Sequence, residues 1–141
     1  MDKKLIFKTE YWEIFLSPDQ KYLGRGIVLL KREAGHLSDL TQEENADFLT
    51  IVKKLEKTFK KTFGATMFNW SCLLNNAYKN DPPAPKVHWH FRPRYKNAVE
   101  VGGEIFSDPN FAHHYLRGAE NEKIVSKEIF DIIVRKIQEH I

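Results

Sequence analysis

The sequence predicts an α+β fold with a mainly antiparallel sheet of five or six strands, one long central helix and a C-terminal helix. Most of the short segments rich in β-branched and aromatic residues follow one another without a helix between them, so neighbouring strands can pair in the antiparallel sense. Only two segments have the three- and four-residue apolar spacing of amphipathic helices. No internal repeat, linker or low-complexity segment divides the chain, and we therefore expect one domain over residues 1–141.

The first three strands are expected at residues 5–8, 11–16 and 24–32. Ser17-Pro18-Asp19-Gln20 has the composition of a turn, because Pro18 presets its own backbone angle and Asp19 can bond its own backbone. The third strand contains the continuous apolar run Ile27-Val28-Leu29-Leu30. This run predicts a central strand that is buried on both faces.

Thr41 begins the signal for the long helix. Its side chain can cap free N–H groups, and Glu44, three residues later, can complete a capping box. Gly64 is suited to end the helix. Apolar residues at helical spacing predict one buried stripe, formed by Phe48, Val52, Leu55, Phe59 and Phe63.

The second half of the chain is expected to add three strands and the C-terminal helix. Residues 66–74 form a strand, in which Cys72 points into the core and is unreactive. The proline-rich residues 75–85 form a loop that leads into the next strand, so these two strands can be antiparallel neighbours. Further along, we expect a short strand and a turn at 99–106, irregular structure at 107–118 and a helix from about Glu122 onward.

The segment Lys86 to Arg94 carries the strongest functional signal. Side chains alternate between the two faces of a strand, and one face here holds Lys86, His88, His90 and Arg92. The other face is apolar and requires a core. Because like charges in one row repel, an anionic ligand would relieve the repulsion. We interpret this strand as the floor of a phosphate site.

Two other interpretations of these residues are available. An exposed sheet face often carries lysine and arginine to remain soluble or to prevent edge pairing. Zinc is disfavoured, because a structural site needs four protein ligands and a catalytic site about three. Cys72 is the only cysteine that could supply a thiolate ligand, and the sequence contains neither a CxxC nor an HExxH motif.

Composition and charge limit the classes of function. The sequence is 42% hydrophobic and 13% aromatic, as in ordinary soluble globular proteins. A net charge of +3 suits an anionic small molecule and is too small to indicate a nucleic-acid scaffold. One cysteine cannot form an internal disulfide, and no segment has the length of a signal peptide or a membrane span. These features predict a cytoplasmic protein that binds neither nucleic acid nor membrane.

Lys86 to Arg94 also resembles the signature strand of the histidine-triad (HIT) superfamily, in its dinucleoside polyphosphate hydrolase-like branch. The pattern of that strand is His-φ-His-φ-His-φ-φ, where φ is apolar, often followed by Pro-Arg. Pro93-Arg94 sets the register, so that His90 takes the third position, His88 the middle one, and Lys86 stands in place of the first histidine.

The resemblance extends upstream and covers roughly residues 5 to 95. Gly26-Ile27-Val28-Leu29 is similar to the family's Gly-His-φ-Leu strand. Asp19, eight residues before Ile27, matches a position that contacts the ribose hydroxyls in such proteins. Asn75, thirteen residues before His88, matches the asparagine near the bound phosphate.

The resemblance implies a HIT-like domain with a defined chemistry. Such a protein is a nucleotide phosphohydrolase or nucleotidyl transferase that cleaves at the α-phosphate of dinucleoside polyphosphates or AMP conjugates. The reaction proceeds through a nucleotidyl-histidine intermediate and needs no metal or other cofactor. The resemblance implies that His88 is the nucleophile and that His90 hydrogen-bonds a phosphate or protonates the leaving group. It also implies that Lys86, Arg92 and Asn75 bind phosphate and that Asp19 binds the ribose. A homodimer formed through the helix and a sheet edge is also implied.

Three departures from the family pattern leave a second function open. Lys86 cannot relay a proton as an imidazole does, Ile27 replaces the upstream histidine, and prolines 82, 83 and 85 replace the usual hydrogen-bond donors before the signature strand. The alternative is therefore a nucleotide-binding regulatory protein with little or no turnover. Nucleic-acid binding ranks third, because the aromatic residues of the key strand face the expected core.

Overall fold

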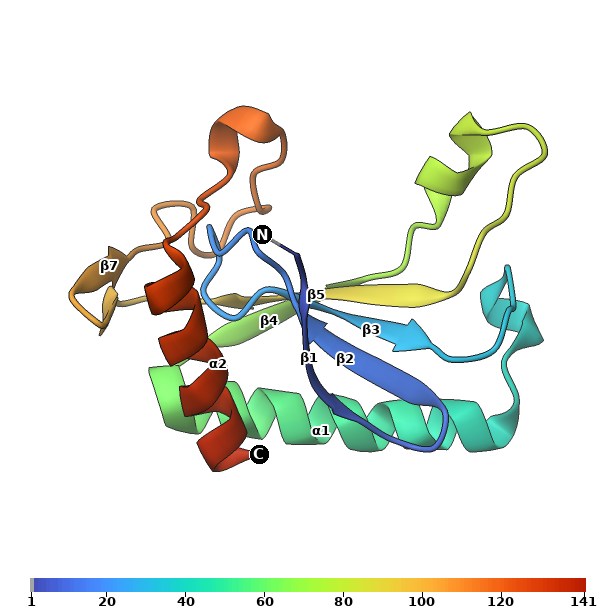
Figure 1. The fold of residues 1–141 in the computed structure, drawn as a ribbon, viewed down its shortest axis with the longest axis horizontal. Coiled ribbons are helices and arrows are strands. Elements are labelled where there is room, and N and C mark those ends of the chain that lie inside the picture. Colours follow the sequence, from blue (N-terminus) through green and yellow to red (C-terminus); the bar gives the residue numbers. More distant parts are fainter. Residues whose placement is uncertain (1) are drawn as a thin grey trace.

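The computed structural model describes residues 2–141, which form an antiparallel sheet lying over one long helix (Figure 1). The sheet has five strands in the order β1-β2-β3-β5-β4. Their bounds are β1 Lys4–Lys8, β2 Trp12–Leu16, β3 Gly26–Leu30, β4 Met67–Ser71 and β5 His88–Arg94. This arrangement confirms the predicted α+β class, and β4 and β5 are antiparallel neighbours as expected.

The predicted sixth strand lies outside the main sheet. Residues 99–106 form a separate hairpin of β6 (Val99–Val101) and β7 (Glu104–Phe106). Gly102 and Gly103 both adopt positive φ angles, of 59° and 88°, between the two strands. Because glycine tolerates this backbone conformation, the chain reverses here and forms two short strands where the sequence predicted one.

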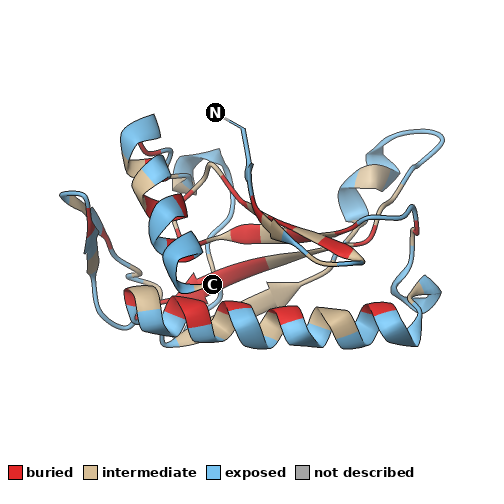
Figure 2. Cartoon of the chain, turned by 60° about the horizontal axis from the view of Figure 1, so that its bottom comes forward, coloured by how far each residue is buried: buried red, intermediate tan, exposed pale blue. Residues whose placement is uncertain are grey.

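The long helix α1 (Gln42–Phe63) has the predicted ends. Thr41 Oγ1 accepts a hydrogen bond from the Glu44 N–H at 3.1 Å, and Glu44 Oε1 accepts one from the Thr41 N–H at 2.8 Å. Gly64 ends the helix with a left-handed φ of 74°. The predicted stripe needs one correction. Ile51 is buried, whereas Phe48 and Val52 are only half-buried. The buried residues of α1 lie on the side that the helix turns toward the sheet (Figure 2).

The two faces of the sheet have different surroundings. Fully buried side chains cover the face that packs on α1: Trp12, Ile14, Leu16, Val28, Leu30 and Phe91. On the opposite face Ile27 pairs with His90 and Leu29 with His88, and Ile27 and Leu29 are only half-buried. The prediction that this central strand is buried on both faces is therefore wrong, because α1 covers only one of them.

The C-terminal helix α2 (Lys127–His140) begins later than predicted. Ser126 Oγ caps it by accepting a hydrogen bond from the Ile129 N–H at 3.2 Å, and residues 119–121 before it form a short 3-10 turn. Its buried residues Phe130, Ile133, Val134 and Ile137 join the same core cluster as α1. In the predicted loop at 75–85, Asn75–Lys79 form one 3-10 turn.

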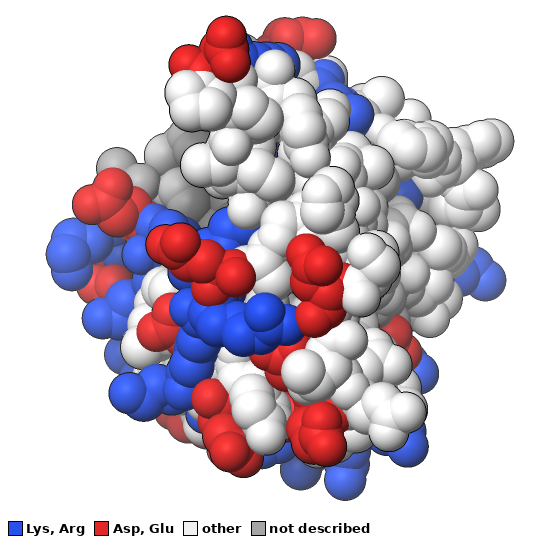
Figure 3. Space-filling view, turned by 90° about the vertical axis from the view of Figure 1, so that its right-hand side faces the viewer, with Lys and Arg blue, Asp and Glu red and all other residues white. Residues whose placement is uncertain are grey.

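One face of the molecule carries charges of both signs. On the end of the molecule where α1 begins, lysine and arginine side chains lie among aspartate and glutamate (Figure 3). This face therefore carries no continuous basic patch of the kind that binds nucleic acid. Within residues 2–141, none of the helices is both long and apolar enough to cross a bilayer.

Candidate active site

Strand β5 places two imidazoles side by side on the open face of the sheet. The ring centroids of His88 and His90 are 4.9 Å apart, with an angle of 76° between the ring planes. Between and beyond them on the strand, Trp89 and Phe91 point the other way, where Trp89 stacks on Phe48 of α1 with centroids 5.0 Å apart. The predicted two-faced strand is thus present, and its imidazoles line a pocket of about 270 Å³.

A main-chain hydrogen bond selects the tautomer of His88. Its Nδ1 lies 2.8 Å from the carbonyl oxygen of Lys86. A carbonyl oxygen can only accept, so Nδ1 carries the proton. In the neutral ring Nε2 therefore holds the lone pair, which is the requirement for a nucleophile.

His90 is kept neutral by its surroundings. Burial, followed by the positive charges of His88, Arg92, Arg25 and Arg117, lowers the pKa of His90 to about 4. Its buried Nδ1 has no hydrogen-bond partner within residues 2–141. The ring lines the pocket, and the single N–H of a neutral imidazole can hydrogen-bond a ligand oxygen. The free protein at neutral pH has no second proton on this ring with which to act as an acid.

All six residues singled out from the sequence line this one pocket: Asp19, Asn75, Lys86, His88, His90 and Arg92. They come from distant parts of the chain. Asn75 is exposed at the start of the 3-10 turn after β4, Lys86 is half-buried just before β5, and Arg92 is buried within β5. The roles assigned to them remain predictions.

Asp19 is already engaged by three protein donors. Its Oδ1 accepts hydrogen bonds from the main-chain N–H groups of Lys21 and Lys123, both at 3.0 Å, and its Oδ2 pairs with Arg25. A carboxylate has about four lone-pair directions, so one is left for a ligand hydroxyl. Asp19 therefore stabilises the pocket through these contacts, with or without a bound ligand.

Sequence reasoning missed several pocket residues. The pocket is also lined by Lys21, Tyr22, Arg25, Ser71, Asn76, Tyr115 and Arg117. Arg25 had a signal, because strand alternation places it on the same face as Ile27. Tyr115 and Arg117 had none, since they lie more than twenty residues beyond the signature strand in a segment without regular structure.

Side-chain anchors bring this C-terminal segment to the pocket. The Leu116 N–H donates to the hydroxyl of buried Tyr22 at 2.7 Å. Arg94, fully buried, pairs with Asp108 at 2.6 Å and donates to the carbonyls of Asn110 and His113, both at 2.8 Å. The segment consequently forms one wall of the site.

Two further features of the described residues concern possible metal ligands and the one thiol. Across residues 2–141 no three His, Cys, Asp or Glu side chains gather in a group that could hold a metal ion. Cys72 is half-buried against the core, and burial raises the pKa of its thiol. A thiol with a raised pKa is a poor nucleophile at neutral pH.

The fold and the pocket together define a protein that presents two adjacent imidazoles among cations on an open sheet face. The chain belongs to the HIT domain family, whose model matches residues 1–97. Residue 86 is a lysine, and that it stands in place of the first triad histidine remains a prediction.

Individual relatives agree with this assignment. A bis(5′-nucleosyl)-tetraphosphatase (asymmetrical) from Schizosaccharomyces pombe is 26% identical over 130 residues, which cover 89% of this chain and 69% of the relative. An uncharacterized HIT-like protein from Methanocaldococcus jannaschii is 26% identical over 98 residues, 70% of this chain and 74% of the relative. The crystal structure of a histidine triad protein from Sinorhizobium meliloti has the same fold, with a TM-score of 0.74, 18% identity, and coverage of 99% of this chain and 90% of that one.

Proposed function

We propose that this protein is a nucleotide hydrolase or nucleotidyl transferase that acts at an α-phosphate, with His88 as the nucleophile. The observation that carries the proposal is the hydrogen bond from His88 Nδ1 to the Lys86 carbonyl, which leaves the Nε2 lone pair free. Nε2 attacks phosphorus in line with the leaving group, and an N–P bond forms as the bond to the leaving atom breaks. A leaving oxygen departs as an anion, whereas a leaving nitrogen takes a proton from water. Water, or another acceptor, then takes the nucleotidyl group and frees the imidazole.

The other pocket residues are assigned to binding the phosphates. Phosphoryl transfer depends mainly on positioning and on offsetting negative charge. Lys86, Arg92 and Asn75 supply cations and a hydrogen-bonding amide at this pocket. Because the pKa of His90 lies near 4, we assign His90 to hydrogen bonding with a phosphate oxygen in preference to protonating the leaving group.

The nucleoside is assigned to the β2–β3 side of the sheet. Asp19 has one lone-pair direction left for a ribose hydroxyl. Phe15 and Ile27 are cross-strand partners, both half-buried, on the same open face as His90. They offer an apolar surface of the kind on which a base can lie.

Dinucleoside polyphosphates are the proposed substrate class, with AMP conjugates as the second. The similarity to the fission-yeast tetraphosphatase supports a substrate with several phosphates. So does the charge of the pocket, whose lining contains the cations Lys21, Arg25, Lys86, Arg92 and Arg117 against the anions Asp19 and Glu122. The alternative is a regulatory protein that binds the nucleotide and turns it over slowly or not at all, which the lysine at position 86 favours.

One assay separates these functions. The protein is incubated with diadenosine tetraphosphate or an adenosine phosphoramidate, and AMP release is followed by chromatography. We expect release by the wild type and a loss of about three orders of magnitude or more in His88→Ala, because the nucleophile is gone. His140→Ala, at an exposed position at the end of α2, is the matched control and keeps wild-type activity.

The outcomes have distinct meanings. Undiminished AMP release by His88→Ala would exclude His88 as the nucleophile. Tight AMP binding by a wild type that releases no AMP would instead favour the regulatory function.

We further propose that residues 1–141 form one HIT-like domain and that it works in the cytoplasm. The family model matches residues 1–97, yet the hydrophobic core cluster also contains Val101, Phe106, Phe130, Ile133 and Ile137 from beyond that point. The cytoplasm is supported by the single cysteine, which cannot form an internal disulfide.

A homodimer across the free edge of β4 is also a proposal. β4 is an edge strand, and in the part of the chain that the structure describes it pairs with β5 on one side and with no strand on the other. The adjacent part of α1 exposes Lys53, Lys57 and Lys60, which would repel their counterparts in a second copy. Sedimentation velocity should therefore find a dimer whose population grows as salt screens these charges.

A further inference from the structure

Arg92 is a buried cation without an obvious structural purpose. Its side chain lines the pocket, and the residue is 8% exposed. Within residues 2–141 it forms no ion pair. An unpaired buried charge destabilises a fold, so this arginine requires another explanation.

Arg94, two residues along the same strand, is an arginine with a structural role and serves as a comparison for Arg92. It is fully buried, pairs with Asp108 through two nitrogens at 2.6 and 3.0 Å, and also donates to the side-chain oxygen of Asn69 at 2.9 Å. Arg92 has no such partners.

The guanidinium of Arg92 is held in a fixed orientation. Its central carbon lies 3.8 Å from the centroid of the Tyr115 ring, in the C-terminal wall of the pocket. This cation–π contact fixes the face of the guanidinium. The N–H groups lie at the edge of the guanidinium and stay available to donate hydrogen bonds to a ligand. Tyr115 is itself supported edge-on by Tyr22, with centroids 6.5 Å apart.

More positive charge surrounds the same end of the pocket. Arg25 and Arg117 both line it. Burial and then the charge of Arg25 lower the pKa of Arg92 to about 10, so Arg92 is still protonated at neutral pH. Asp19 is the nearby carboxylate, and it is engaged with Arg25. The pocket lining also contains Glu122, which is exposed to solvent. The three arginines therefore still outnumber the carboxylates, and an anion from outside would restore the balance.

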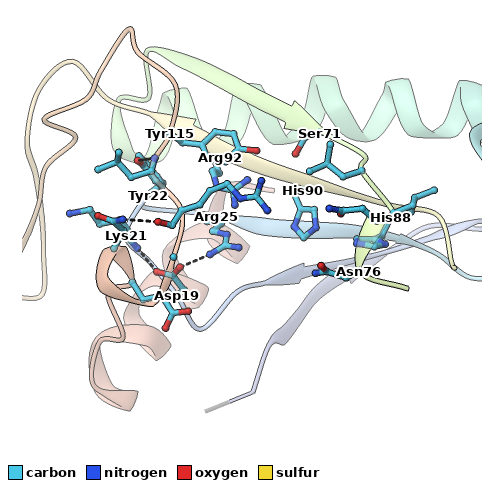
Figure 4. A pocket seen from close by; sticks show the side chains of 18 of the residues that line it. Asp19, Lys21, Tyr22, Arg25, Ser71, Asn76, His88, His90, Arg92 and Tyr115 are labelled. Atoms are coloured by element: carbon cyan, nitrogen blue, oxygen red, sulfur yellow. Dashed lines mark hydrogen bonds and ion pairs between the residues drawn. The ribbon is translucent and has the colours of Figure 1, made fainter. Parts of the chain in front are cut away.

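This cluster is set apart from the proposed nucleophile. Figure 4 shows Lys21, Tyr22, Arg25, Arg92 and Tyr115 gathered at one end of the pocket, His88, Ser71 and Asn76 at the other, and His90 between them. A phosphate next to His88 would lie at the imidazole end. The arginine end has room for a second group.

We propose that Arg92, Arg25 and Arg117 form a second anion subsite, which binds a phosphate group of the ligand other than the one next to His88. The proposal rests on the proposed function in that one ligand reaches both ends. The second phosphate has two sources: a phosphate chain attached at the 5′ position, or a phosphate ester on the ribose. The ligand class is therefore a nucleotide with at least two separate phosphate groups.

Calorimetric titration of four ligands tests this subsite. AMP has one phosphate, ATP has a phosphate chain, adenosine 3′,5′-bisphosphate has a phosphate on the ribose, and tripolyphosphate has no nucleoside. The variants are Arg92→Met, Arg117→Met and the control Arg135→Met, on the exposed face of α2. We expect Arg92→Met to weaken binding of ATP or of the bisphosphate about tenfold to a hundredfold, the usual effect of losing hydrogen bonds to a charged group. AMP binding should change less than threefold.

Arg117→Met, at an exposed position, should lower the same affinity several-fold without affecting folding. The ligand whose affinity falls most in these variants identifies the source of the second phosphate. The melting temperature of Arg92→Met separates ligand binding from a structural role. It should equal or exceed that of the wild type, because an unpaired buried charge is removed, whereas a structural role predicts a lower melting temperature.

Equal weakening of AMP, ATP and adenosine 3′,5′-bisphosphate binding by Arg92→Met would overturn the proposal and place Arg92 at the reacting phosphate. A lower melting temperature of Arg92→Met, with Arg117→Met binding all four ligands as the wild type does, would overturn it in favour of a structural role. If the wild type neither binds AMP nor releases it from diadenosine tetraphosphate, but binds tripolyphosphate in an Arg92-dependent way, the proposed function fails while the subsite stands.

Discussion

His88 and His90 are chemically alike and lie on one face of one strand, but their environments give them different uses. The Lys86 carbonyl fixes the proton of His88 on Nδ1. His90 has no such partner for its Nδ1 and is surrounded by cations and by the sheet. The first ring therefore offers a directed lone pair, and the second offers a neutral hydrogen-bonding group.

The burial of His90 predicts how stability depends on pH. The unfolded chain binds a proton at this residue below about pH 6.5, whereas the folded chain binds it only near pH 4. Because the unfolded state holds more protons between these values, the free energy of unfolding should fall as the pH drops through this window. Solvent screening at the partly exposed ring limits the fall to about 1–2 kcal/mol.

Urea denaturation of the wild type and of His90→Asn between pH 7 and pH 4 measures the effect. The variant should have the flatter profile, while His114→Asn, at an exposed histidine, should follow the wild type. Parallel profiles for the wild type and His90→Asn would show that the proton affinity of His90 is the same in the folded and unfolded states.

At the scale of elements, local chemistry accounts for the long helix and less well for the short strands. The capping box and Gly64 mark both ends of α1 within the sequence itself. The start of α2 was predicted too early, because residues before Ser126 continue the apolar pattern although Ser126 is the cap. The hairpin β6–β7 depends on two glycine conformations that periodicity does not reveal.

The N-terminal cap of α1 gives a prediction at this scale. Thr41→Ala removes the hydroxyl that accepts the Glu44 N–H, and should lower the free energy of unfolding by about 1 kcal/mol. Chemical denaturation measures this directly. Thr50→Ala is the matched control: its hydroxyl bonds only the Ala46 carbonyl within the exposed part of the same helix, so we expect a change within about 0.5 kcal/mol. Equal effects at the two positions would argue against a capping role for Thr41.

Across the whole molecule, three connections hold the C-terminal segment against β5, which carries both imidazoles, and against the loop between β2 and β3. Asp19 accepts from the Lys123 N–H, Tyr22 accepts from the Leu116 N–H, and Arg94 pairs with Asp108. The first two connect residues 104 and 94 positions apart in sequence. The pocket wall that contains Tyr115 and Arg117 depends on them.

The Arg94–Asp108 pair is expected to be the strongest of these connections. Both side chains are almost completely buried, at 0% and 2% exposed. Asp108→Ala would leave Arg94 charged and unpaired in the core, which costs about 3–5 kcal/mol. Asp131→Ala is the control, because it breaks the exposed Lys127–Asp131 pair of α2, whose loss should cost at most about 0.5 kcal/mol. Urea melts of the two variants compare them, and a loss below 1 kcal/mol in Asp108→Ala would mean that the pair does not anchor the segment.

Features that depend only on neighbours along the chain follow from the sequence. Strand alternation identified the row of Lys86, His88, His90 and Arg92, and capping and apolar spacing defined α1, because both are set by backbone geometry over a few residues. Tertiary structure alone decided which charged groups have partners. Arg94 meets Asp108 and Arg25 meets Asp19, whereas among the described residues 2–141 Arg92 contacts the ring of Tyr115 and forms no ion pair. Periodicity cannot distinguish these arginines, since the partner of a buried charge comes from a distant segment that packing brings beside it.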